Sequence, residues 1–156
     1  TIWQGLNQTF GPIGTPQRWV NILGNVTAPT GIDSLYYRLN GGAPVHLSRG
    51  PDLRRLQNTG DFNIDLGYAA LNPGANTITL RAQNGFGEVK DTTITVVDNS
   101  SSAVWPIPYS VGWGSPTSLK DSVQIVDGKW ELVSGKARAT ERTPYCGSAA
   151  PSTPPQ

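Results

Sequence analysis

A turn that leads directly into an alternating strand is the feature that most constrains what this chain can fold into. Within Leu71–Asn76, Pro73 fixes φ at one corner of a turn, and Gly74 can adopt the positive φ that the next corner often requires. From Thr77 to Ala82, polar and apolar residues then alternate. This period of two predicts a strand with one buried face and one solvated face.

The same combination of turns and strands recurs through the first hundred residues. Asn40-Gly41-Gly42 and Asn84-Gly85-Phe86-Gly87 are both flanked by β-forming residues, so each predicts a hairpin turn. The 18 Gly and 13 Pro suit short strands joined by tight turns, and no stretch keeps a helical apolar period. We therefore expect an all-β sandwich of about seven strands. They include Trp19–Val26, Ser34–Leu39, Pro44–Ser48, Phe62–Leu66, Asn76–Gln83 and Thr92–Val97.

Part of this pattern is similar to a known family. The run Leu71-x-Pro-Gly-x-Asn76-x-Ile78-x-Leu80-x-Ala82, the Gly-containing turn after it and the closing Thr/Ile/Val strand resemble the C-terminal half of bacterial immunoglobulin-like domains. The resemblance covers residues 15–98 and implies an immunoglobulin-like antiparallel β-sandwich of a secreted or surface protein, with a spacer or adhesive role. Some members bind calcium at an aspartate that this chain, which reads Ala82-Gln83-Asn84-Gly85, lacks. The resemblance therefore implies no cofactor.

A polar segment divides the chain. Asp98–Ser102 is short, polar and rich in serine, which is typical of a linker. We expect a sandwich domain over residues 1–98, a linker over 99–103, an incomplete β segment over 104–142 and a tail over 143–156. The tail is dense in Pro, Ser, Thr and Ala, which indicates a disordered segment, or a truncation of a longer protein.

The segment after the linker predicts a hairpin of its own. Ser122–Val126 and Lys129–Val133 flank the two-residue turn Asp127-Gly128, and Ser134-Gly135 ends the second strand. The runs Tyr109-Ser-Val-x-Trp113 and Val126–Leu132 resemble the opening strands of a concanavalin-like jelly roll, as in laminin-G-like and glucan-binding or glucan-cleaving domains. A complete jelly roll has about eight strands, so this resemblance implies a partial domain.

Composition argues against several classes of function. The 12 Lys+Arg and 11 Asp+Glu leave no excess charge for nucleic acid or an anionic membrane, and no apolar run approaches the roughly 18 residues of a membrane span. Cys146 is the one cysteine and His46 the one histidine, so we expect neither a Cys-based metal site nor a Ser-His-Asp relay. One basic cluster, Arg49, Arg54 and Arg55 around Asp52, is interpreted as a solvated loop or an anion or glycan contact.

Paired carboxylates are the arrangement that a glycosidase would need. Asp61 and Asp65 flank one predicted strand, and Asp127 and Glu131 flank the second hairpin. Residues four apart on a strand are separated by about 13 Å, beyond the roughly 5–10 Å between glycosidase carboxylates. We therefore expect no catalytic residues and no enzyme activity.

Aromatic side chains are the candidate ligand-binding residues, because Trp and Tyr rings can stack on sugars. Tyr36 and Tyr37 are adjacent on a strand, so one of them must point away from the core. Trp113 and Trp130 are the candidates in the second segment. Trp113 and Trp130 can equally fill a core, and so can Trp3, Trp19 and Trp105.

These observations lead to one expected function and one alternative. The expected function is a non-catalytic spacer or interaction module of a larger secreted or cell-surface bacterial protein, whose partners are the other domains of that protein. The alternative is an accessory, carbohydrate-binding fragment of a carbohydrate-active enzyme, with polysaccharide as partner. Neither involves nucleic acid or membrane insertion, and both place the chain outside the cell.

Overall fold

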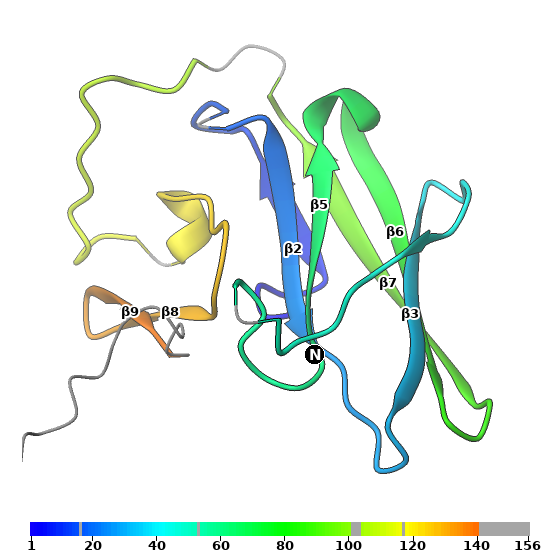
Figure 1. The fold of residues 1–156 in the computed structure, drawn as a ribbon. Coiled ribbons are helices and arrows are strands. Elements are labelled where there is room, and N and C mark those ends of the chain that lie inside the picture. The colour runs from blue at the N-terminus through cyan, green and yellow to red at the C-terminus, as the bar shows by residue number, and fades with distance from the viewer. Residues whose placement is uncertain (16, 53, 101–103, 117, 141–156) are drawn as a thin grey trace, which may run out of the picture.

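The computed structural model describes residues 1–15, 17–52, 54–100, 104–116 and 118–140, and these form an all-β fold (Figure 1). The expected fold class is therefore confirmed. Two short 3₁₀ turns, Tyr68–Ala70 and Leu119–Asp121, are the helical elements of the described part. The strands are β1 (Asn7–Phe10), β2 (Trp19–Asn25), β3 (Ile32–Leu39), β4 (Val45–His46), β5 (Asp61–Gly67), β6 (Gly74–Asn84), β7 (Val89–Asp98), β8 (Trp130–Val133) and β9 (Lys136–Ala139).

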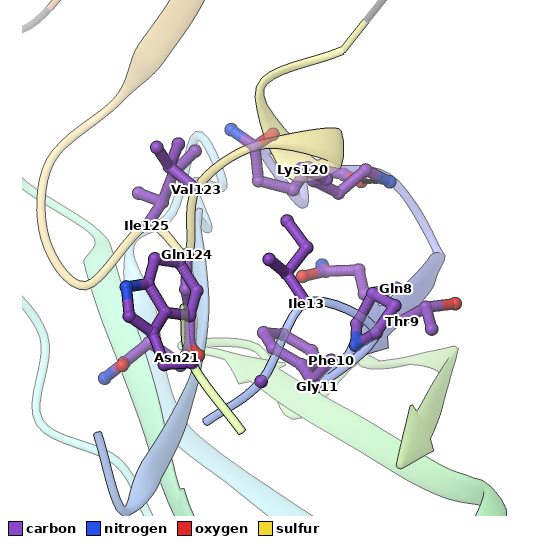
Figure 2. A pocket seen from close by; sticks show the side chains of 14 residues that line it. Gln8, Thr9, Phe10, Gly11, Ile13, Asn21, Lys120, Val123, Gln124 and Ile125 are labelled. Atoms are coloured by element: carbon purple, nitrogen blue, oxygen red, sulfur yellow. Dashed lines mark hydrogen bonds between the residues drawn. The ribbon is translucent and has the colours of Figure 1, made fainter. Parts of the chain in front are cut away.

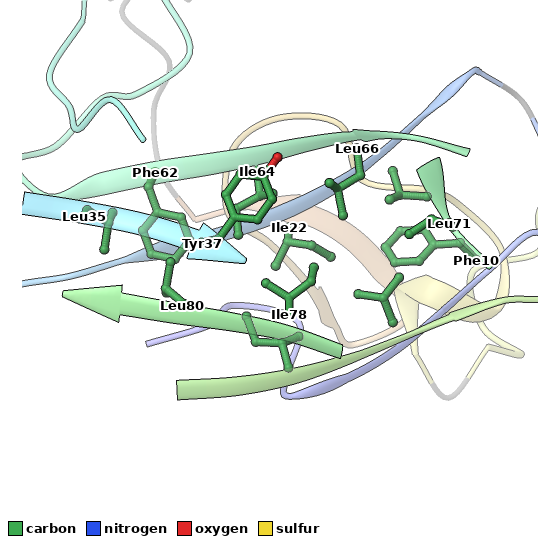
Figure 3. Packing of buried hydrophobic residues seen from close by; sticks show 13 residues of the cluster. Phe10, Ile22, Leu35, Tyr37, Phe62, Ile64, Leu66, Leu71, Ile78 and Leu80 are labelled. Carbon is green, nitrogen blue, oxygen red and sulfur yellow. The ribbon is translucent and has the colours of Figure 1, made fainter. Parts of the chain in front are cut away.

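Two sheets of unequal size form the body of the molecule. One has five strands in the order β1-β7-β6-β3-β4, and the other is the antiparallel pair β2-β5. Their inner faces supply one hydrophobic cluster, in which every strand of the sandwich except β4 takes part (Figure 3). Its members are Phe10, Val20, Ile22, Leu35, Tyr37, Phe62, Ile64, Leu66, Leu71, Ile78, Leu80, Ile94 and Val96.

The alternation seen in the sequence decides which side chains enter this core. Along β6, Ile78 and Leu80 are buried while Thr77 is exposed. Along β7, Ile94 and Val96 are buried, while Thr93 and Thr95 are more exposed. The predicted inner and outer faces of these strands are therefore confirmed, because a period of two sorts side chains to opposite faces of a sheet.

The predicted turns are also present. Asn40-Gly41-Gly42 leads from β3 into β4, and Asn84–Gly87 joins β6 to β7. In the second turn, the Asn84 side-chain oxygen accepts hydrogen bonds from the backbone N–H groups of Phe86 (3.0 Å) and Glu88 (2.9 Å). Gly74 has φ of 84°, as the turn before β6 requires.

One strand was not predicted, and it is not antiparallel. β1 pairs in parallel with residues 95–98 of β7, so the expected purely antiparallel sandwich is wrong at this edge. The strand Asn-Gln-Thr-Phe carries one large apolar side chain, which is too few for a sequence signal. Before it, Ile2 bridges to Gly24 of β2, and the chain then crosses between the sheets at Gly5.

The hairpin of the second segment lies one turn later than predicted. Ser122–Val126 is not a strand, and β8 pairs instead with β9 across Ser134-Gly135. Ser134 (φ 48°) and Gly135 (φ 70°) both have positive φ, which is the backbone of a two-residue type I′ turn. The Asp127-Gly128 signal therefore marks a bend before β8 rather than the hairpin turn. Residues 101–103 of the expected linker, and the whole expected tail over 143–156, lie outside the described residues.

We predict that Gly74→Val lowers the free energy of unfolding by about 1–3 kcal/mol, because a β-branched residue is strained at φ of 84°. A Cβ at this position would meet no atom within 4 Å, so the cost comes from the backbone alone. Urea denaturation measures the change. Thr77→Val, on the exposed face of β6, is the control and should be nearly neutral, and equal stability of the two variants would contradict the argument.

We also predict that a chain ending at Ser100 folds on its own, because every member of the hydrophobic cluster lies between Phe10 and Val96. Its thermal unfolding, followed by circular dichroism, should stay cooperative. The midpoint should lie within about 6 °C of that of the full chain, a shift that corresponds to about 1 kcal/mol for a domain of this size. Loss of the cooperative transition would show that residues after 100 are needed to complete the fold.

Candidate functional site

The second segment, from residue 104 to 140, lies against the outer side of the β2–β5 sheet (Figure 1). Gln124 Nε2 donates to the carbonyl of Trp19 at 2.6 Å, and the Tyr68 hydroxyl contacts Gln124 Oε1 at 3.3 Å. Lys120 Nζ donates to the carbonyls of Gln4 and Asn7 at 3.1 and 3.3 Å. Polar contacts thus hold the segment at several points along the first hundred residues.

A small cavity of about 40 Å³ marks part of this junction (Figure 2). Residues of the N-terminal segment, among them Phe10 and Ile13, surround it together with Lys120, Val123 and Ile125 of the second segment. Gly14 lies so close to the backbone of Trp105 that a Cβ there would overlap it. The Trp105 ring packs in turn on Tyr109, with ring centroids 4.8 Å apart. Trp105 therefore lies against both Gly14 of the N-terminal segment and Tyr109 of its own segment.

A larger and more apolar groove lies within the second segment itself. Its volume is about 420 Å³, and it brings together Trp113 and Trp130, two of the predicted ligand-binding residues. Leu119 lies in the same lining and is 4% exposed. The complete lining of described residues is Trp113, Leu119, Val123, Gln124, Ile125, Val126, Asp127, Trp130 and Ala137.

Local structure fixes both ends of this groove. Leu119 begins a 3₁₀ turn with a capping box, in which the Ser118 N–H donates to Asp121 Oδ2 at 2.8 Å and the Ser118 side chain accepts from Lys120 N. At the other end, the hairpin turn at Gly135 approaches the backbone of Trp113 and Gly114. The hairpin and the strand-free stretch before it are thus held against each other.

Trp130 is held by its edge while part of its surface stays open. Its indole Nε1 donates to the carbonyl of Asp127 at 2.9 Å, so the polar edge of the ring is satisfied within the protein. The residue as a whole is 39% exposed. A fixed and partly exposed indole in an apolar groove can contact a ligand through its face, because ligand sites combine aromatic walls with few polar groups.

Asp127 is the charged residue of the groove lining, and its surroundings raise its pKa. Burial is the main reason that its pKa is raised, and the negative charges of Asp52 and Asp65 add to this. The backbone N–H of Gly128, which donates to Asp127 Oδ1 at 2.8 Å, and the Arg55 guanidinium act in the opposite direction. The side chain therefore offers a hydrogen-bond acceptor at the edge of the two tryptophans.

Arg55 joins the second segment to the β2–β5 sheet. It forms an ion pair with Asp65 of β5 at 3.1 Å, and its second guanidinium nitrogen donates to the carbonyl of Val126 at 3.1 Å. The Asn21 side-chain amide of β2 donates to the same Asp65 carboxylate. Of the predicted basic cluster, Arg55 is therefore engaged in an ion pair, and Arg49 donates to the backbone carbonyls of Ile32 and Asp33.

The two predicted tyrosines point to opposite faces of β3, apart from the tryptophan groove. Tyr37 lies in the core and is 8% exposed, and burial raises the pKa of its hydroxyl. Tyr36 lies on the outer face, with its ring centroid 5.9 Å from that of His46 on β4. Its cross-strand neighbour Arg81 pairs with Asp91 at 2.6 Å. The sequence left open which tyrosine faces outward, and the structure identifies Tyr36.

The carboxylates considered for catalysis lie in separate surroundings. Asp61 is 1% exposed and accepts hydrogen bonds from Asn25 Nδ2 (2.8 Å) and the Asn58 N–H (2.7 Å). Asp65 is paired with Arg55, and Glu131 lies 3.5 Å from Lys129. Asp127 is the one of the four that lines the tryptophan groove, a role that the turn signal Asp127-Gly128 did not reveal.

Neither known proteins nor a metal site or membrane-spanning helix among the described residues indicates a function for this chain. No family model, curated protein or solved structure matches this chain. Among the described residues, no three His, Cys, Asp or Glu side chains gather closely enough to hold a metal ion. The helical turns of those residues are too short to cross a membrane. The tryptophan groove is the candidate site in the described part of the chain that brings two of the predicted ligand-binding residues together.

We predict that Asp127→Asn raises the thermal midpoint near neutral pH and leaves it unchanged in acid. The folded protein raises the pKa of this carboxyl above its ordinary value of 3.8, so the folded state binds the proton more tightly than the unfolded chain does. The stability contributed by this group is therefore present below pH 3.8 and is lost as the pH rises through the folded pKa.

Thermal melts of the two proteins across this pH range measure the effect. Asp33→Asn, which removes the same charge from an exposed position of β3, is the control and should not change the pH dependence. A lower midpoint for Asp127→Asn at neutral pH would contradict the sign of the effect.

Proposed function

We propose that this protein is a non-catalytic interaction module of a larger secreted or cell-surface bacterial protein, and that its interaction site is the tryptophan groove. The observation that carries this proposal is that Trp113 and Trp130, 17 positions apart in the sequence, line one apolar groove of about 420 Å³. An open groove with aromatic walls and a single charged group has the composition of a binding site.

The strand arrangement supports the resemblance to immunoglobulin-like domains, from which the proposed role as an interaction module comes. A sheet in the order β1-β7-β6-β3-β4 faces the pair β2-β5, and an N-terminal segment contacts both sheets before β1 joins β7 in parallel. The turn at Gly74 and the β6–β7 hairpin, which carry the sequence resemblance, both form. Domains of this kind are repeated spacers or adhesive modules, so a partner of this chain would include neighbouring domains of the same protein.

A second candidate function is carbohydrate binding as the accessory part of a carbohydrate-active enzyme. The observation that favours it is the pairing of two tryptophans with a carboxylate at one groove. The C–H face of a sugar ring is apolar and stacks on an indole, while its hydroxyl groups donate to an acceptor such as Asp127. Of the other carboxylates considered for catalysis, Asp61 is buried, and Asp65 and Glu131 each lie next to a basic side chain, which supports binding rather than hydrolysis.

We predict that a neutral β-glucan oligosaccharide changes the tryptophan fluorescence of the full chain in a saturable way, without release of reducing sugar. Trp130→Ala and Trp113→Ala should each weaken binding at least about tenfold, because each removes one aromatic wall of the groove. Titration followed by fluorescence, with calorimetry as a second readout, measures the affinity.

Phe86→Ala is the matched control, because Phe86 is an aromatic residue that is 79% exposed on the β6–β7 turn, outside the groove. It should bind as the wild type does. A flat titration with neutral, anionic and cationic oligosaccharides would rule out the carbohydrate candidate and leave the protein-interaction role. Release of reducing sugar would overturn the non-catalytic assignment.

A further inference from the structure

The charges around the tryptophan groove are distributed unevenly. Asp127 is the charged side chain among the described residues that line it, and none of those residues is basic. The acidic Asp52 and Asp65 lie close enough to Asp127 to act on it electrostatically. Arg55 acts on Asp127 in the opposite sense but is paired with Asp65, so Asp127 is the charged side chain that a ligand in the groove would meet.

The basic side chains of the hairpin lie on its other face. Trp130 pairs with Ala139 and Leu132 pairs with Ala137, so the groove face of the hairpin is apolar. The alternate positions, where Glu131 pairs with Arg138 and Val133 with Lys136, face the opposite way because side chains alternate along a strand. Their positive charges do not line the groove.

Arg55, the nearest cation of the sandwich, is already engaged. Its guanidinium contacts both Asp65 oxygens, at 3.1 and 3.3 Å, and the Val126 carbonyl at 3.1 Å. A ligand carboxylate in the groove would have to displace these contacts to reach the cation. It would also face Asp127, and a like charge in such a position costs affinity.

Given the carbohydrate-binding candidate above, on which this inference rests, we propose that the groove selects uncharged or amino sugars and rejects uronic acids. The two indoles contact the apolar face of a sugar ring. Asp127 accepts hydrogen bonds from hydroxyl groups, or from a protonated amine in a glucosamine unit. An oligogalacturonate also offers apolar ring faces but brings a carboxylate to each unit. Asp127→Asn and salt separate the effect of that charge from the effects of its different linkage and ring stereochemistry.

The experiment titrates the full chain with three oligosaccharides of equal length at pH 7, a β-1,4-glucan, a glucosamine oligomer and an oligogalacturonate. We expect the first two to bind and the oligogalacturonate to bind at least about tenfold more weakly. Asp127→Asn should reduce this difference in affinity by strengthening the binding of the oligogalacturonate. Asp33→Asn, the control with the same change of charge outside the groove, should leave the difference unchanged.

A second measurement uses the wild-type protein alone. Raising the salt concentration from about 0.05 M to about 0.5 M should reduce the difference in affinity as well, because salt screens exposed charges. Equal affinity for the glucan and the oligogalacturonate, or a difference that neither salt nor Asp127→Asn changes, would overturn the charge selection while leaving carbohydrate binding in place. Absence of binding to all three would instead overturn the carbohydrate-binding candidate, and the selection with it.

Discussion

Burial of β2 on both of its faces is the constraint on which the rest of this structure depends. Five successive residues of the strand, Val20–Gly24, are buried. Val20 and Ile22 enter the core between the sheets, but Asn21 and Leu23 point to the outer side, where a two-stranded sheet has no third layer of its own. The second segment lies on that side, where Gln124 donates to the Trp19 carbonyl, and residues 1–3 pair with the free edge of β2.

The second segment is attached to the outer side of the β2–β5 sheet mainly through polar groups. Asn21 of β2 and Arg55 both bind the Asp65 carboxylate, and Arg55 continues to the carbonyl of Val126. Arg55 and Asp65 are 38% and 43% exposed at their side chains, so this pair adds little to the free energy of folding. Its larger effect is to position Val126 and the adjacent Asp127, because the guanidinium donates to the Val126 carbonyl with a fixed geometry. The same contact thus connects the sandwich to the groove.

The sequence alone was sufficient to predict features that depend on residues close together in the chain. Strand alternation identified the inward residues of β5, β6 and β7, and turn chemistry identified Gly74 and both hairpins of the sandwich. Prediction from the sequence failed for features that depend on contacts with distant segments of the chain. β1 is a strand because β7 offers it an edge. Ser122–Val126 forms no strand, and the side chain of its Gln124 donates to the Trp19 carbonyl. Asp127-Gly128 and Ser134-Gly135 are similar turn signals, and only the structure distinguishes the bend from the hairpin.

The same reasoning explains why the groove stays open. A hairpin of two strands has no second sheet to cover its apolar face, and such a pair is marginal in water unless that face is packed. β8 and β9 contribute Trp130 and Ala137 to the groove, and Leu119 with the Trp113 loop covers this face only in part. Trp130 remains 39% exposed although its indole N–H is bonded to the Asp127 carbonyl. Removal of this exposed apolar surface from water by a ligand would lower the free energy, which supports the groove as the proposed binding site.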